Sequence, residues 1–191
     1  MEGMPGLLAL DRELFLAING AHNAWADPVM HAASSMVVWF PLYALFLFLL
    51  QRDHGWRGLG MAALAIAGMI LCSDTGSVVL FKNTVMRLRP CHAADLQGMV
   101  HLVDDCGGRY GFISSHAANH FAIAAFMAGA LAGVARWITP ALFLWAALIG
   151  YSRIYLGQHY PGDVIAGALY GSLIGWIFFA IFERAMQRWV G

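Results

Sequence analysis

Long apolar stretches, separated by short polar ones, dominate the pattern of the chain. Runs of roughly 20 apolar residues are long enough to cross a bilayer core of about 30 Å. We therefore expect transmembrane helices at about 28–50, 58–81, 115–135, 138–156 and 163–182. The stretch LLALDRELFLAING is too short and too charged to cross. Its apolar side chains nevertheless recur at helical spacing, which predicts an amphipathic helix on the membrane surface at about 5–20.

Composition supports a membrane protein and argues against other classes. Of the 191 residues, 60% are hydrophobic and only 12% are charged, whereas a soluble domain carries about a quarter charged residues. The formal net charge is zero and no basic run is present, so a nucleic-acid partner is not expected. We expect one all-α membrane domain over residues 1–191, with a long polar loop at about 82–114. Its oligomeric state cannot be predicted.

The five crossings would place polar segments on two faces of the membrane. The face with the 82–114 loop carries six Lys and Arg residues, among them Lys82, Arg89 and Arg153. If these three belong to a binding site, the opposite face carries the excess of basic residues that marks the cytoplasmic side. Those opposite residues are Arg52, Arg57, Arg136, Arg184 and Arg188. The 82–114 loop would then face the outside or the periplasm of a bacterial inner membrane.

The cysteines leave two alternatives open. Cys72 lies in an apolar run, whereas Cys91 and Cys106 both lie in the 82–114 loop. In an oxidising compartment these two could form a disulfide closing a loop of about 15 residues, which would stabilise the fold by roughly 3 kcal/mol. Otherwise they are two free thiols.

Three polar clusters interrupt the apolar pattern where helices should reach the same face. KNTVMRLRP (82–90) follows the second apolar run, SSH (114–116) begins the third, and SRIYLGQHYPGD (152–163) joins the fourth to the fifth. Because successive spans alternate in direction, all three clusters should lie in one layer. We expect them to form a single site.

The cationic and hydroxyl residues in these clusters are suited to binding a phosphate. Lys82, Arg89 and Arg153 offer donors without acceptors, and an Arg fork matches phosphate oxygens. Ser114 and Ser115 stand where a helix begins, and free backbone N–H groups at a helix start attract anions.

Two histidines could supply the chemistry. His159 and Asp163 lie one helical turn apart, so the carboxylate can orient the ring and leave Nε2 free to attack phosphorus. His116 could protonate the leaving oxygen and then activate water. A metal site of His116, His120, His159 and Asp163 is the alternative, but the nearby cations would repel a divalent ion.

Other polar residues receive weaker expectations. Asn119 and His120 should contact the leaving group or line the pocket. Arg87 should face headgroups or water. Asp74, which is costly within a span, should make a supporting helix–helix hydrogen bond, with Ser73 or Thr75 as nearby candidates.

Taken together, the three clusters resemble the three-part signature of the type 2 phosphatidic acid phosphatase family. The resemblance covers roughly residues 75–170 and rests on Lys82 with Arg89-Pro90, on Ser114-Ser115-His116, and on Ser152-Arg153 with His159 and Asp163. The family usually has Pro-Ser-Gly-His in the second part, where this chain has Ile113-Ser114-Ser115-His116. A positive φ at Ser115 would cost of order 1 kcal/mol.

The resemblance implies a membrane enzyme that hydrolyses lipid phosphates without a metal or other cofactor. His159 would be the nucleophile, Asp163 its partner and His116 the general acid, while Lys82, Arg89, Arg153, Ser114 and Ser115 would bind phosphate. SSHAANH is most similar to bacterial undecaprenyl-diphosphate phosphatases, which recycle the cell-wall carrier lipid. Phosphatidylglycerophosphate, phosphatidate and the 1-phosphate of lipid A are alternative substrates. A non-catalytic lipid-phosphate binder or an anion transporter would explain the cations but not the oriented His159–Asp163 pair.

Overall fold

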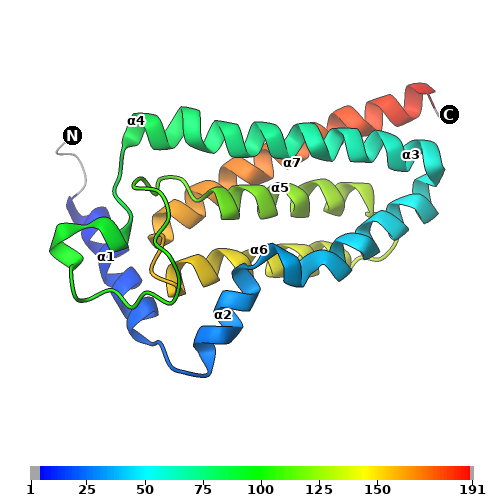
Figure 1. The fold of residues 1–191 in the computed structure, drawn as a ribbon. Coiled ribbons are helices and arrows are strands. Elements are labelled where there is room, and N and C mark those ends of the chain that lie inside the picture. Colours follow the sequence, from blue (N-terminus) through cyan, green and yellow to red (C-terminus); the bar gives the residue numbers. More distant parts are fainter. Residues whose placement is uncertain (1–4, 190–191) are drawn as a thin grey trace.

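The computed structural model describes residues 5–189, and this part of the chain is almost entirely helical (Figure 1). Its β-pairing is limited to an isolated bridge between Leu88 and Tyr110. The helical elements, in chain order, are α1 (Pro5–Gly20), α2 (Ala26–Ser34), η1 (Met36–Trp39), α3 (Phe40–Gly76), η2 (Ser77–Lys82), α4 (Asn83–Val85), η3 (Pro90–His92), η4 (Ala94–Leu96), α5 (Ser115–Ala130), α6 (Ile138–Tyr155) and α7 (Pro161–Trp189).

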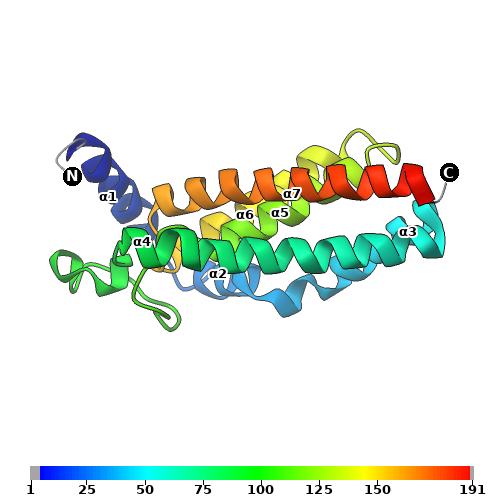
Figure 2. The ribbon, with the colours of Figure 1, turned by 90° about the horizontal axis from the view of Figure 1, so that it is seen from above.

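Helix α3 is bent back on itself at Gly55, so that its two limbs run in opposite directions (Figure 1). Gly55 has φ 68° and ψ −176°, a conformation that glycine adopts without the steric cost of a Cβ. The two limbs hold the first two predicted spans. The turn lies at the opposite end of the molecule from α1 (Figures 1 and 2).

The helices form an elongated bundle (Figure 2). Within residues 5–189, three helical segments are long and apolar enough to cross a membrane: Met36–Val85, which contains both limbs of α3, Ile138–Tyr155 and Pro161–Trp189. Large side chains on these segments are 68–78% exposed, which suits a surface solvated by lipid: Leu64, Leu71, Leu144 and Leu169. The chain is an integral membrane protein, and the predicted class, an all-α membrane bundle, is confirmed. The number of crossings stays a prediction.

Several helix ends differ from the predicted boundaries. The first predicted span begins at about 28, but residues 26–34 form the separate helix α2 because Ser35 has an extended backbone (φ −80°, ψ 127°). Serine favours such breaks because its hydroxyl competes for backbone hydrogen bonds. Helix α5 ends at Ala130, short of the predicted 135, and α7 continues to Trp189, beyond the predicted 182.

Close contact between α5 and α7 fixes the geometry of the site. Gly167, Gly171 and Gly175 repeat at four-residue intervals on α7, and the backbone of α5 lies against them. A Cβ at Gly167 would lie 2.6 Å from the carbonyl oxygen of Ser114. The start of α5 is thereby held beside the start of α7, where the backbone N–H of Ser114 donates to the carbonyl oxygen of Asp163 at 2.9 Å.

Helix α1 is docked on the bundle by one buried edge. Phe15 is fully buried, and its ring centroid lies 5.4 Å from that of Tyr160 in an edge-to-face arrangement. Asn19 is also buried and donates to the carbonyl oxygens of Tyr155 and His101. This docking places the polar side of α1 against the turn between α6 and α7. Its location on the membrane surface stays a prediction.

Candidate active site

The three polar clusters lie at one end of the bundle, next to α1 (Figure 1). The end of η2 meets the start of α5 there, because Lys82 Nζ donates to the hydroxyl of Ser115 at 2.7 Å. The same hydroxyl lies 2.6 Å from that of Ser77. Ser115 begins α5, and its φ is not positive, since Met86 is the one non-glycine residue with positive φ in the described chain. The expected backbone cost at Ser115 therefore does not arise.

Ser114 is the N-cap of α5. It is fully buried, and its hydroxyl accepts a hydrogen bond from the backbone N–H of Ala117 at 3.4 Å. This contact uses the hydroxyl oxygen as an acceptor, so its O–H can still donate to an anion.

His159 and Asp163 form a buried pair. His159 is 1% exposed and Asp163 is fully buried, with Nδ1 3.5 Å from Oδ2. At this distance His159 Nδ1 makes no hydrogen bond in the described chain, and Oδ2 accepts instead from the backbone N–H of Tyr160 at 3.0 Å. Burial lowers the pKa of His159 to about 4; Asp163 opposes that shift, while Arg89 and Arg153 add to it. Near neutral pH the ring is uncharged, as a nucleophile must be.

The other oxygen of Asp163 is held by Arg87, a contact that sequence reasoning missed. Arg87 Nη1 donates to Asp163 Oδ1 at 2.8 Å, and Nη2 donates to Asp11 Oδ2 at 2.6 Å. Its guanidinium lies over the Tyr160 ring, 3.9 Å from the centroid. Asp11 Oδ1 accepts from the backbone N–H of Gly162 at 2.7 Å. The expectation that Arg87 faces headgroups or water is wrong, because two carboxylates surround it.

Arg89 reaches the same pair from the loop. Gly111 marks the meeting point, because a Cβ there would lie 3.1 Å from both Arg89 Cγ and Asp163 Oδ2 and 3.5 Å from His159 Nδ1. Arg89 Nη1 donates to the carbonyl oxygen of Cys106 at 3.1 Å. Burial lowers the pKa of Arg89 below its usual value, although the Asp163 carboxylate opposes the shift.

The donor groups of two arginines are incompletely used. Arg153 Nη1 contacts the hydroxyl of Ser34, but the buried Nε atoms of both Arg153 and Arg89 have no hydrogen-bond partner in the described chain. Buried donors without acceptors are costly, and an anion would satisfy them.

The two arginines, Arg89 and Arg153, line a polar pocket of about 430 Å³. His116 lines it with them, whereas the other predicted residues, Lys82, Ser114, Ser115 and His159, are not among its lining residues in the described chain. The remaining lining residues come from α2 and its end, from the loop and from the α6–α7 turn, and sequence reasoning did not include them: His31, Ser34, Ser35, Asp104, Asp105, Gly107 and Gln158.

A second, apolar cavity of about 500 Å³ meets the polar pocket at His116. Apolar residues of α3 and α5, together with Met36, form most of its wall: Met36, Phe46, Ile66, Ile70, Ile123 and Met127. Its polar lining residues are Tyr43, Asp74, Ser115, His116, Asn119 and His120. The cavity provides an apolar space beside a cationic one, as a lipid phosphate requires.

The partners of His120 fix its role in this wall. Its Nδ1 lies 2.8 Å from the carbonyl oxygen of His116, to which it must donate. Nε2 is therefore an acceptor, and the hydroxyl of Tyr43 donates to it at 3.3 Å. Both ring nitrogens are used within the protein, so His120 supports the wall and the backbone of His116.

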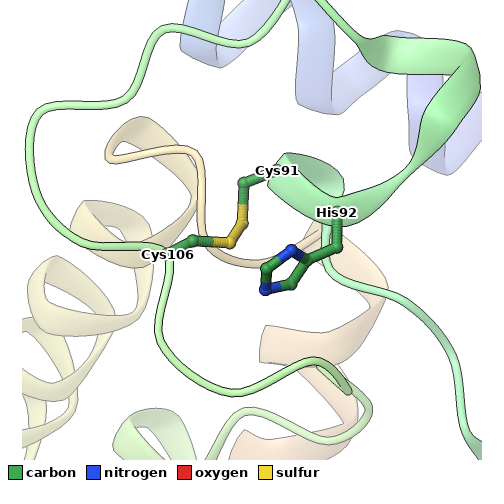
Figure 3. A group of neighbouring side chains, drawn as sticks. All are labelled: Cys91, His92 and Cys106. Atoms are coloured by element: carbon green, nitrogen blue, oxygen red, sulfur yellow. A yellow bond between two sulfur atoms is a disulfide. The ribbon is translucent and has the colours of Figure 1, made fainter.

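The loop above the site is closed by a disulfide between Cys91 and Cys106, whose Cα atoms are 6.1 Å apart (Figure 3). His92 lies beside the two sulfur atoms, so the three side chains form a compact group (Figure 3). Sulfur atoms bonded to each other are not thiolates, so in this state they are not metal ligands. The disulfide instead braces the loop from which Arg89 extends.

Comparisons with known proteins agree with this geometry. The chain is 36% identical to a lipid A 4'-phosphatase of Bacteroides thetaiotaomicron over 94% of this chain and 80% of that protein. It is 28% identical to the undecaprenyl-diphosphatase BcrC of Bacillus subtilis over 89% of this chain and 83% of that protein.

Solved structures share the fold. The crystal structure of Aquifex aeolicus LpxE superimposes with a TM-score of 0.64 at 33% identity, covering 90% of this chain and 95% of that one. A PAP2-type phosphatidylglycerolphosphate phosphatase from Bacillus subtilis gives a TM-score of 0.67 at 22% identity, covering 97% and 89%. Residues 59–187 match the PAP2 superfamily. This chain therefore belongs to the PAP2 superfamily and is a lipid phosphatase of the membrane.

Proposed function

We propose that this lipid phosphatase works without a metal ion, through a phosphohistidine intermediate on His159. Lys82, Arg89 and Arg153 would hold the phosphate oxygens, together with the hydroxyls of Ser114 and Ser115. The unpartnered Nε atoms of Arg89 and Arg153 support this assignment. So does the absence of a charge on His159 near neutral pH, which follows from its pKa of about 4.

In the first step, Nε2 of His159 attacks phosphorus, and a P–N bond forms as the bond to the leaving oxygen breaks. His116 donates a proton to that oxygen. In the second step His116 accepts a proton from water, which attacks phosphorus and breaks the P–N bond. Inorganic phosphate leaves, and both histidines return to their starting states.

Arg87 and Asp11 serve this mechanism by positioning Asp163. Asp163 orients the His159 ring, Arg87 balances the buried charge of Asp163, and Asp11 holds Arg87 and the N–H of Gly162. Each carboxylate oxygen of Asp11 and Asp163 accepts a hydrogen bond from an arginine or from a backbone N–H. Such a network restricts the ring to one orientation.

For the substrate, we propose a phosphate group of a lipid A type glycolipid. The carrying observation is the meeting of a cationic pocket and an apolar cavity at His116, which places the leaving group next to acyl-chain space. The similarity to a lipid A 4'-phosphatase over 94% of this chain supports the choice of glycolipid. Undecaprenyl diphosphate is the second candidate, supported by the similarity to BcrC.

A panel of lipid phosphates tests the substrate. The purified enzyme in detergent should release phosphate from lipid A faster than from undecaprenyl diphosphate, phosphatidylglycerophosphate or phosphatidate. Mass spectrometry of the product should locate the lost phosphate on the lipid A disaccharide. Faster hydrolysis of undecaprenyl diphosphate would replace the glycolipid proposal. Activity that a chelator removes and zinc restores would contradict the metal-free mechanism.

We place the site on the outer, periplasmic face of a bacterial inner membrane. The disulfide supports this side, because disulfides persist in oxidising compartments. After mild reduction, a membrane-impermeant thiol reagent should label Cys91 and Cys106 in spheroplasts. The Cys91→Ser/Cys106→Ser double variant serves as the control. Labelling that appears only after lysis would reverse the orientation.

A further inference from the structure

A carboxylate and an amide interrupt the wall of the apolar cavity. Asp74 lies on α3 and Asn119 on α5, and both line the cavity beside His116. Asn119 Nδ2 donates to Asp74 Oδ1 at 3.3 Å. The expected helix–helix hydrogen bond of Asp74 therefore exists, but its partner is Asn119 rather than Ser73 or Thr75.

This hydrogen bond leaves two acceptors free. Asn119 Oδ1 is buried and has no partner in the described chain. Across residues 5–189, Asp74 makes no ion pair, and its side chain makes no hydrogen bond other than that with Asn119. An ionisable group within a span is costly and usually functional. Asp74 is exposed where it lines the cavity, so its second carboxylate oxygen can accept from a ligand with a donor, whereas Asn119 Oδ1 is buried.

The pair lies on the leaving-group side of the site. Asn119 follows His116 by three positions on α5, so both lie on the same helix face about one turn, or roughly 5 Å, apart. If His116 protonates the leaving oxygen, the next chemical groups of the leaving group extend toward Asn119 and Asp74. His120, another polar residue of the wall, has both nitrogens occupied.

We propose that Asp74 and Asn119 form a subsite for a hydroxyl or amide N–H of the leaving group. This inference rests on the proposed function and deepens it, because it selects a class of lipid. An acylated amino sugar offers hydroxyl and amide donors close to its phosphate. Polyprenyl chains and diacylglycerol offer none. The subsite therefore favours a phosphorylated glycolipid over polyprenyl and diacylglycerol phosphates.

The test is a comparison of two substrates in detergent micelles: an N-acylated, O-acylated glucosamine phosphate and a phosphatidate with the same acyl chains. Asp74→Leu should lower kcat/KM for the glucosamine lipid roughly 10- to 100-fold, the effect of one hydrogen bond to a charged group. For phosphatidate the change should stay within about threefold, since its leaving group has no donor. Thr75→Leu, at the neighbouring exposed position, should leave both rates unchanged.

A change on the substrate side sharpens the test. Replacing the sugar's amide with an ester removes the N–H donor. This should slow the wild-type enzyme and have little further effect on Asp74→Leu, because the two changes remove the same contact. If the hydroxyl is bound instead, the corresponding deoxy sugar should show this coupling.

The outcomes separate two kinds of failure. Equal losses on both substrates, or no loss on either, would overturn the subsite. Wild-type hydrolysis of phosphatidate but not of the glucosamine lipid would also overturn the subsite, together with the glycolipid choice, and would leave the phosphohistidine mechanism intact. Phosphate release unaffected by His159→Ala would instead overturn the mechanism.

Discussion

The polar pocket and the apolar cavity, which meet at His116, are held together in opposite ways. Behind the polar pocket the charged groups hold one another: Asp11 contacts Arg87, Arg87 contacts Asp163, and Asp163 lies beside His159. In the apolar cavity, the side chain of Asp74 has the Asn119 amide as its one hydrogen-bond partner among residues 5–189, and acceptors remain free there. We therefore place the proposed chemistry at the charged network and the proposed substrate choice at the apolar cavity.

The largest effect should come from removing the proposed nucleophile. His159→Ala should lower kcat by roughly four orders of magnitude or more on every lipid phosphate, because no covalent intermediate can form. Binding of the lipid phosphate, followed by isothermal titration, should persist because the cations remain. A residual rate within tenfold of wild type would remove His159 from the reaction.

The next largest effect on activity should come from breaking the charged network at Arg87. Arg87→Gln leaves a buried carboxylate without its cation, and we expect roughly a 100-fold loss in kcat with a smaller change in KM. The loss of one partner of a buried pair should also lower the free energy of unfolding, by up to about 3 kcal/mol. Arg87→Lys keeps the charge and should recover part of both. A change confined to KM would show that Arg87 contacts substrate instead.

The pH profile should report the buried imidazole. Because burial lowers the pKa of His159 to about 4, the ring stays neutral and nucleophilic at pH 6 and 5. Below about pH 4 the ring becomes protonated, so kcat/KM should fall roughly tenfold per pH unit. Circular dichroism must show that the fold persists there. An acid limb near 6.5, the ordinary value for histidine, would contradict the desolvated site.

Asp11 tests the outer end of the same network and should have a smaller effect. Asp11→Asn keeps an oxygen for the N–H of Gly162 but loses the charge opposite Arg87, so we expect a three- to tenfold loss in kcat. Glu13→Gln, at an exposed position of α1, is the matched control and should have no effect. Rates that fall equally in both variants would point to a general effect of charge on α1.

The smallest effect on activity should follow loss of the disulfide. Cys91→Ser with Cys106→Ser should reduce stability by about 3 kcal/mol, measured as a lower Tm in detergent. Activity at 20 °C should change only about twofold. Arg89 donates its hydrogen bond to the backbone carbonyl of residue 106, and the double variant keeps that carbonyl. A hundredfold loss at a temperature where the protein stays folded would give the disulfide a direct role.

The sequence indicated some residues of the candidate site and not others. Lys82, Arg89, His116, Arg153 and His159 could be found because each stands in a short segment at the end of an apolar run. Topology alone brings such segments to one face.

Arg87 and Asp11 could not be assigned in the same way. Arg87 occupies a position in the first cluster that looks solvent-facing, and Asp11 lies about 150 residues before Asp163 on a helix read as interfacial. Their contact depends on how α1 docks through Phe15 and Asn19, a tertiary feature without a local pattern. The apolar cavity likewise depends on the separation of α3 and α5, so of its wall the sequence indicated only Asn119 and His120, which lie one turn from His116.

Trapping the phosphoenzyme tests the central claim most directly. The His116→Ala variant should be given an aryl phosphate whose phenolate leaves without being protonated. It should then form the intermediate but hydrolyse it slowly. Protein labelled with ³²P should then carry acid-labile, alkali-stable phosphate, and mass spectrometry should locate it on His159. The His116→Ala/His159→Gln double variant should carry none. Label on another residue, or phosphate release without any covalent label in a rapid quench, would contradict the account.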